Sequence, residues 1–115
     1  MTADAPGELV KGTLHMLILK TLTLEPLHGY GIGVRLEQIS DGKFLINGGS
    51  LFPALRRLER DGLIRGEWRV TENNRRAKYY RLTTAGRRRL DAETEKWNRM
   101  AGIIAGILRT TPESL

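Results

Sequence analysis

Residues 47–61, NGGSLFPALRRLERD, carry the pattern that decides the fold of this 115-residue chain. Apolar residues follow the i, i+3, i+4, i+7 spacing of a helix with one buried face: Leu51, Ala54, Leu55 and Leu58. The turn before them favours helix capping, with Ser50 as a candidate cap, and Pro53 is tolerated because it lies near the helix start. Gly62 ends the helix. The stretch therefore predicts a helix that buries one side and exposes the other.

The exposed side of this predicted helix is polar and cationic. At about 100° per residue, a second set of residues lies opposite the apolar stripe or flanks it: Gly49, Phe52, Pro53, Arg56, Arg57 and Arg60. Arginines in such positions suit phosphate contacts and bidentate recognition of guanine. The alternative is an ordinary solvated face, on which Arg57 pairs with Asp61 one turn later.

Two further helices are predicted upstream, over residues 9–24 and about 29–40, because apolar residues recur there at helical spacing. Their buried faces combine Leu14, Leu17, Ile18, Thr21 and Leu22 in the first helix with Ile32, Leu36 and Ile39 in the second. A short loop over residues 26–28 joins the two, and residues 43–46 are a candidate extended piece. Residues 1–8 are small and polar, so we expect them to be disordered.

Downstream, segments 63–71 and 77–83 are rich in Trp, Val and Tyr, which predicts a β-hairpin. Its polar turn has a cationic tip that can reach phosphates or a narrow minor groove. The tip residues are Asn73, Asn74, Arg75 and Arg76, with Lys78 behind them. An ordinary polar turn is the alternative, since asparagines tolerate positive φ. Two arginines at a turn apex are expected to have nothing to pack on, which favours the functional interpretation.

A last helix is predicted from a cap at Thr83 or Thr84 to about Arg109. Its seam positions alternate in steps of 4 and 3, as in a coiled coil: Leu90, Thr94, Trp97, Ala101, Ile104 and Leu108. A chain of this size cannot cover such a face alone, so the seam predicts a homodimer. A large Trp97 beside a small Ala101 can leave a slot for a planar aromatic effector between two copies. Plain packing of Trp97 in the interface is the alternative.

The positive charge of the chain is concentrated in one segment. The formal net charge is +6 and the pI is about 10.2. Residues 56–89 alone hold 12 Lys or Arg and 4 Asp or Glu, whereas the rest of the chain has a slight acidic excess. This segment covers the exposed helix face and the hairpin. Its charge indicates a polyanionic partner at those two elements.

Nothing in the sequence indicates an enzyme, a cofactor or a metal site. Residues 29–33, GYGIG, lack the GxGxxG spacing of a nucleotide loop, and His15 and His28 have no other ligand at metal-binding spacing. The absence of cysteine excludes disulfides and thiolate chemistry. No secretory signal is recognised, and the apolar stretches are far shorter than the ~20 residues of a membrane span. We therefore expect a cytoplasmic protein that does not bind membranes.

The order of three helices, a hairpin and a long helix predicts a mainly α fold, the winged helix-turn-helix, with the third helix in the major groove and the wing on the backbone or minor groove. Residues 9–83 would form this DNA-binding domain, and residues 84–115 a dimerisation helix with a short tail. The predicted function is a sequence-specific transcriptional regulator bound to a double-stranded DNA operator. The expected DNA contacts are Asn47, Gly49, Ser50, Phe52, Pro53, Arg56, Arg57, Arg60, Asn74, Arg75, Arg76 and Lys78.

Two other functions fit the same elements. A winged-helix module that binds RNA or DNA without sequence preference would use the basic segment equally well. A protein–protein adapter would use the shape alone, but its exposed face should carry aromatic anchors rather than arginines.

Four stretches together resemble the PadR family of transcriptional regulators: LVKGTL at 9–14, LHGYG at 27–31, NGGSLFPALRRLE at 47–59 and RRAKYYRLT at 75–83. The resemblance runs from about residue 9 to residue 108. It implies a dimeric winged-helix repressor, often of detoxification or efflux genes, that a small molecule releases. The single C-terminal helix is similar to that of the short members of the family.

One residue departs from the family pattern. Phe52 stands where the family usually has Tyr, so the hydroxyl contact to the DNA backbone that the resemblance implies is absent, although Phe52 can still pack on sugars. Some short members bind flat aromatic compounds at the dimer interface and others have no known effector. The resemblance thus adds only weak support for an effector at Trp97.

Overall fold

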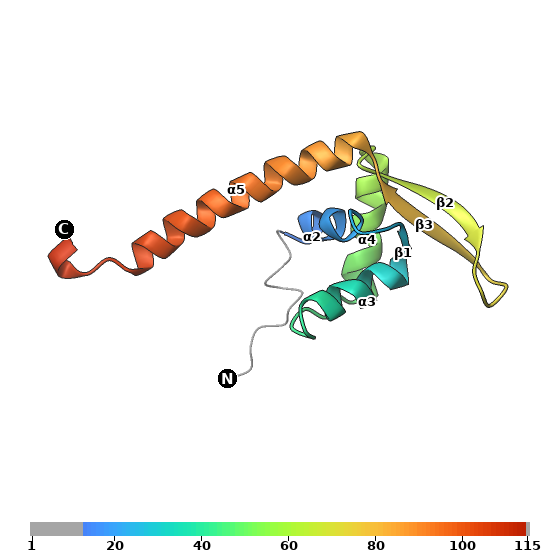
Figure 1. The fold of residues 1–115 in the computed structure, drawn as a ribbon, viewed down its shortest axis with the longest axis horizontal. Helices are drawn as coiled ribbons and strands as arrows, with labels where there is room; N and C mark the ends of the chain where they lie inside the picture. Colours follow the sequence, from blue (N-terminus) through green and yellow to red (C-terminus); the bar gives the residue numbers. More distant parts are fainter. Residues whose placement is uncertain (1–12, 115) are drawn as a thin grey trace.

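The computed structural model describes residues 13–114. Its elements follow one another as α2 (Leu14–Thr21), β1 (Leu27–His28), α3 (Gly29–Ile39), α4 (Gly48–Arg60), β2 (Ile64–Val70), β3 (Arg76–Leu82), α5 (Thr84–Leu108) and a short 3-10 turn (Pro112–Ser114). Helices α2, α3 and α4 lie together, the β2–β3 hairpin projects from one end of α4, and α5 extends away on the other side (Figure 1). The predicted mainly α fold, a winged helix-turn-helix with a long C-terminal helix, is confirmed.

Helices α3, α4 and α5 each begin after a residue whose side chain caps the helix. The side chain of Asn47 accepts a hydrogen bond from the Ser50 N–H at 2.9 Å and so caps α4. Ser50 therefore lies inside the helix, and its prediction as the cap was wrong. His28 caps α3 through its Nδ1, and Thr83, rather than Thr84, caps α5 through its hydroxyl.

The helix ends differ modestly from the prediction. Helix α2 stops at Thr21, because the N–H groups of residues 23 and 24 turn back to carbonyls three residues earlier. The predicted helical residues 9–12 and the predicted disorder of residues 1–8 fall outside the described residues. Ile39, predicted to be buried, is mostly exposed at the last turn of α3. After α4 the chain reverses at Gly62, whose φ of +74° is readily adopted only by glycine.

The sheet has three antiparallel strands in the order β1-β3-β2. Strand β1 was expected to be a loop, but Leu27 pairs with Tyr80 and His28 with Tyr79. The candidate extended piece over residues 43–46 forms no strand. In the hairpin, Gly66 lies opposite Tyr80 and Trp68 lies opposite Lys78. Directly opposite residues of paired strands lie on the same face of the sheet.

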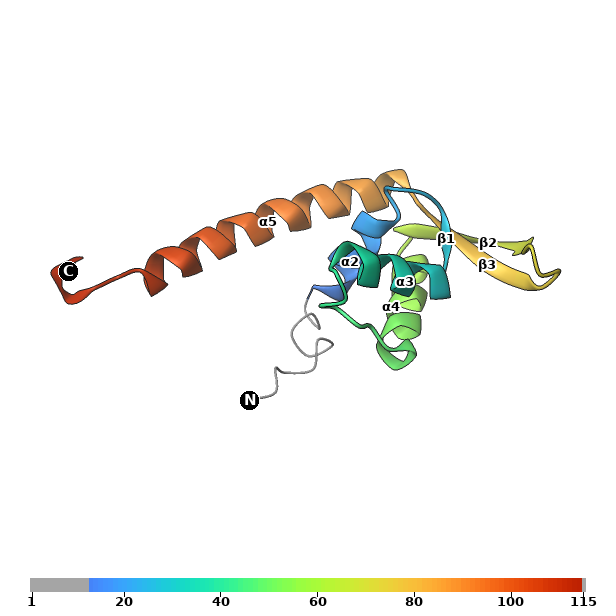
Figure 2. The ribbon, with the colours of Figure 1, turned by 60° about the horizontal axis from the view of Figure 1, so that its bottom comes forward.

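The core lies between the three short helices and the base of the hairpin. Its buried hydrophobic residues are Leu14, Ile18, Leu19, Leu22, Ile32, Leu36, Leu51, Ala54, Leu55, Leu58, Leu63, Ile64, Tyr80 and Leu90. Helix α5 joins this core only through its first turns, where Gly86 and Leu90 are buried. The C-terminal half of α5 projects away from the other elements (Figure 2). Within residues 13–114, no helix is long and apolar enough to cross a bilayer.

Candidate nucleic-acid interface

Helix α4 presents a cationic face to solvent. Its apolar stripe is turned into the core, so Arg56, Arg57 and Arg60 lie on the exposed side. Arg60 pairs with Asp61 at 3.3 Å between Nε and Oδ1, but both side chains remain largely exposed. The alternative Arg57–Asp61 pair is not formed. Within the described chain, the guanidinium groups of Arg56 and Arg57 have no hydrogen-bonding or ion-pairing partner, which leaves them available to an anion.

The start of α4 is open to solvent as well. Asn47, Gly49 and Ser50 are exposed, and Pro53 is partly exposed one turn further on. Backbone N–H groups at a helix start favour anions such as phosphates. These predicted contact residues therefore lie on the same side of α4 as its arginines.

Phe52 is 44% exposed and packs partly against the start of α3. A Cβ placed on Gly29 would lie only 2.6 Å from the Phe52 ring, so the glycine makes room for the ring. Phe52, Tyr30 and Val34 also line a shallow hollow between α3 and α4. The Phe52 ring thus offers an apolar surface beside the cationic face and no hydrogen-bonding group.

The tip of the wing is a tight polar turn. Asn74 adopts a φ of +58°, and its N–H donates to the Thr71 carbonyl at 2.9 Å. Arg75 is exposed, and its guanidinium has no partner among the residues described. Arg76 is different, because its guanidinium lies 5.2 Å from the centre of the Trp68 ring. The expectation that both arginines have nothing to pack on is therefore wrong for Arg76.

Lys78, predicted to contact DNA, already has a partner. Its Nζ donates to Glu59 Oε1 of α4 at 2.8 Å, and this hydrogen bond raises the pKa of Lys78 above its usual value. Lys78 and Trp68 are opposite one another in the hairpin. Lys78 is thus placed between the wing and α4 rather than at the free tip.

The opposite face of the hairpin carries a second aromatic–cation contact that sequence reasoning missed. Arg69 lies 5.1 Å from the centre of the Tyr79 ring, and Arg69 Nε also pairs with Glu67 at 3.1 Å. The Tyr79 ring also lies 5.3 Å from the ring of His28 in β1, and the two rings are nearly perpendicular. The alternation of side chains along β2 and β3 was the available signal, but it becomes informative only once the register of the two strands is known.

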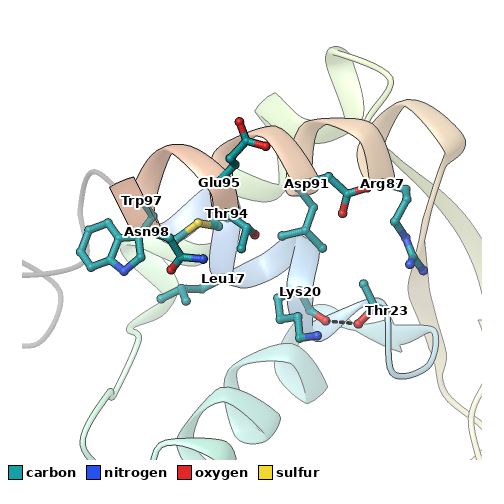
Figure 3. Close-up of a pocket in the computed structure, with 11 residues that line it drawn as sticks. Leu17, Lys20, Thr23, Arg87, Asp91, Thr94, Glu95, Trp97 and Asn98 are labelled. Carbon is teal, nitrogen blue, oxygen red and sulfur yellow. Dashed lines mark hydrogen bonds between the residues drawn. The ribbon is translucent and has the colours of Figure 1, made fainter. Parts of the chain in front are cut away.

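The seam of α5 divides into a covered and an uncovered part. Leu90 is buried in the core of its own chain, whereas Trp97, Ile104 and Leu108 are about half exposed or more. A groove of about 700 Å³ runs between α2 and α5, with Leu17 and Lys20 on one side and Thr94 and Trp97 on the other (Figure 3). Its walls are partly apolar, and Trp97 stands at one end.

A three-helix unit with a cationic third helix, followed by a cationic wing, defines a DNA-binding protein of the winged-helix class. Comparison with known proteins identifies the family. Residues 18–92 match the family described as "Transcriptional regulator PadR-like family", and the chain belongs to it. The chain is accordingly a DNA-binding transcriptional regulator and not an enzyme.

Two curated proteins are similar to this chain along most of its length. The chain is 29% identical to a transcriptional regulator of Mycobacterium tuberculosis over 86% of this chain and 89% of that one. It is 39% identical over 76% of its length to a 37.1 kDa protein in a transposon of Streptomyces fradiae, of which it spans only 24%.

Solved structures show the same likeness. A PadR family transcriptional regulator from Eggerthella lenta is 36% identical, with a TM-score of 0.79 over 90% of this chain and 88% of that one. A transcriptional regulator from Clostridium thermocellum gives a TM-score of 0.81 at 25% identity, over 89% of this chain and 99% of that one.

Proposed function

We propose that this protein is a sequence-specific, homodimeric repressor that inserts α4 into the major groove of an operator. The observation that carries the proposal is the row of exposed arginines opposite the buried stripe of α4, with an unpaired Arg56 at its centre. A guanidinium that is free of protein partners can form the bidentate pair with guanine O6 and N7. Arg56 is assigned to base recognition on this ground. Arg60, whose pair with Asp61 is exposed to solvent, is assigned to the same role one turn later, and Arg57 to a neighbouring phosphate.

The wing contacts the adjacent backbone or the minor groove in this proposal. Arg75 extends from the turn with a free guanidinium, whereas the guanidinium of Arg76 lies over the Trp68 ring, so the tip offers one free and one oriented cation. The remaining contacts come from the exposed start of α4 and the wing turn: Asn47, Gly49, Ser50, Phe52, Pro53 and Asn74. Contacts of this kind position the protein on DNA, whereas the α4 arginines select the sequence.

A second copy of the chain covers the exposed part of the α5 seam. Trp97, Ile104 and Leu108 expose large apolar surfaces on one helix face, which monomeric soluble proteins rarely do. Thr94 and Ala101 lie on the same seam. Pairing two α5 helices in this way would hold two α4 helices at a fixed separation, as two operator half-sites require.

The groove beside Trp97 is the proposed site for a planar aromatic effector. A ring stacked on the Trp97 indole would contact both α2 and α5. Binding would change DNA affinity only if it favoured one separation of the two α4 helices over another. An effector site would thus couple the dimer interface to the DNA-binding face.

The direct test is a titration of the duplex upstream of the gene and of a scrambled duplex, at several salt concentrations. We expect a preference of at least ~10³ for the upstream duplex. Arg56→Ala should cost about 1–3 kcal/mol on that duplex and relax the base preference. The pair Arg75→Ala and Arg76→Ala should weaken both duplexes evenly and flatten the salt dependence.

Arg99→Ala is the matched control, because Arg99 is an exposed arginine in the second half of α5, outside both α4 and the wing. Unchanged binding in the α4 and wing variants would contradict the assignment. If the two duplexes were bound with nearly equal affinity, the result would favour the module that binds nucleic acids without sequence preference. No measurable affinity for either duplex would favour the protein–protein adapter.

A further inference from the structure

One ion pair connects the recognition helix to the wing. Of the ion pairs in residues 13–114, only Glu59–Lys78 joins α4 to the hairpin. It is also the most shielded of them, with side chains 32% and 30% exposed. The two residues are 19 positions apart in the chain, so the contact depends on the tertiary fold.

The surroundings of this pair are shaped to hold it. Gly66 lies on the strand opposite, where a Cβ would come within 2.3 Å of Lys78 Cε and 3.0 Å of Glu59 Oε2. The Lys78 ammonium also lies 5.7 Å from the centre of the buried Tyr80 ring. The missing side chain at residue 66 therefore provides the space in which the pair forms.

The charge of Glu59 gives the pair a consequence for DNA binding. Glu59 lies between Arg56 and Arg60 on α4, on the flank that faces the wing. A bare carboxylate at this position would repel a phosphate that approaches the arginines, because like charges brought together at an interface are costly. Lys78 removes this repulsion, because its ammonium hydrogen-bonds to the Glu59 carboxylate and compensates the negative charge.

We propose that Lys78 is a positioning residue, which neutralises Glu59 and holds the wing against α4, and that it does not itself bind phosphate. This inference rests on the proposed DNA-binding mode of α4 and the wing. With the wing held in one position, its contacts and those of α4 form together on one stretch of duplex. A wing that moved freely would have to be ordered at each binding event, which lowers affinity for the matching sequence.

A double-mutant cycle on the full chain tests the proposal with Glu59→Gln, Lys78→Met and the combination. Each variant is titrated against the upstream and the scrambled duplex over a range of salt. Lys78→Met should lose roughly tenfold in affinity for both duplexes, because it leaves Glu59 unpaired. Glu59→Gln should bind the scrambled duplex more tightly and steepen the salt slope by about 0.9, because the freed ammonium now reaches a phosphate.

The combined variant decides the role of Lys78. We expect it to regain the wild-type salt slope and most of the affinity lost in Lys78→Met, since the unpaired carboxylate is gone. Lys78→Arg, which preserves the pair, should retain the wild-type slope. If removal of Lys78 instead lowers the slope by about 0.9 in both the wild-type and the Glu59→Gln background, Lys78 binds phosphate directly and the proposal is wrong.

A second variant keeps the test decisive if the charge variants are unstable. Gly66→Ala places a Cβ against Lys78 and Glu59 and so shifts the pair without separating its charges. This variant should reduce the preference for the upstream duplex several-fold and, because both charges remain paired, leave the salt slope unchanged. A wild-type preference in Gly66→Ala would overturn the positioning role. If the wild-type protein shows no preference between the duplexes, the proposed sequence-specific function fails. The salt slopes on the scrambled duplex still determine what Lys78 does.

Discussion

Helices α4 and α5 carry similar apolar stripes in sequence, yet the fold treats them differently. The stripe of α4 is buried by its own chain, with Leu55 at 0% exposure. The stripe of α5 is covered only at Leu90, and further along Trp97 is 52% and Leu108 is 79% exposed. A buried stripe stabilises the domain that contains it, whereas an exposed one must be covered by another molecule.

The difference arises from the elements that pack against each helix. Helix α4 lies against α2, α3 and β2, whereas the main contact of α5 is with α2, which lies beside the first half of α5. Since α2 has only eight residues, it cannot cover a helix of 25. Position in the fold, rather than hydrophobic pattern, therefore separates an internal stripe from an intermolecular one.

The largest expected effect comes from the buried stripe. Leu55→Ala should lower the free energy of unfolding by about 2–5 kcal/mol, because the surrounding core cannot close the cavity completely. Urea unfolding followed by circular dichroism measures the change. Leu108→Ala is the matched control and should cost far less when the dimer is diluted apart. If both variants lost the same free energy of unfolding, the two stripes would contribute equally to the stability of the single chain, and the comparison would fail.

The exposed stripe gives the next largest effect. Ile104→Glu should abolish the dimer and reduce operator affinity about 100-fold, because the two half-sites are no longer bound by one linked unit. Light scattering at micromolar concentrations and a DNA titration measure the two changes. Arg99→Glu places the same charge on the opposite side of α5 and should remain dimeric. A monomeric wild-type protein would refute the role of the seam.

Local patterns predicted most of this fold. The helical spacing of the leucines in α4, the glycine that ends it, and the threonine that begins α5 depend on neighbours within a few residues, so the sequence carries them directly. The alternating polar and apolar residues of the hairpin belong to the same class of signal. The exposure of the α4 arginines could be predicted as well, because the residues opposite a buried helix face must lie on the exposed face.

What the sequence did not reveal depends on distant pairing. Strand β1 has two residues, too few for any periodicity, and exists only because β3 lies beside it. The Glu59–Lys78 pair requires that α4 and the wing meet, and Arg76 finds Trp68 only through the strand register. These contacts turned two predicted DNA-binding cations into residues that also have partners within the chain.

A smaller effect is expected from a ligand that binds in the groove between α2 and α5, beside Trp97. Planar aromatic compounds should quench Trp97 fluorescence and shift operator affinity by roughly tenfold, within the usual range of coupling between two sites. Trp97→Phe leaves Trp68 of the wing as the remaining tryptophan and serves as the control. If no compound quenches the wild type more than this variant at up to ~100 μM, an affinity near −5.5 kcal/mol, Trp97 only packs in the interface.

The smallest effect concerns His15 of α2, which lies near charged residues of both α4 and α5. Burial lowers the pKa of His15 below the usual value of 6.5, and the nearby Arg57 of α4 lowers it further. Arg89 also lowers this pKa, whereas Asp61 and Glu93 raise it. The charged imidazolium is therefore disfavoured in the folded state, and the unfolded chain takes up the proton first as the pH falls.

This order of protonation fixes the direction of the pH dependence. The contribution of His15 to stability is complete above pH 6.5 and declines between that value and the lower pKa of the folded state. Between pH 7.5 and pH 5.5, the free energy of unfolding measured with urea should thus fall more in the wild type than in His15→Gln, because glutamine does not titrate. Other groups that titrate in this range act equally in both proteins, so the difference isolates His15. Parallel losses in the two proteins would mean that His15 is as readily protonated in the folded state as in the unfolded chain.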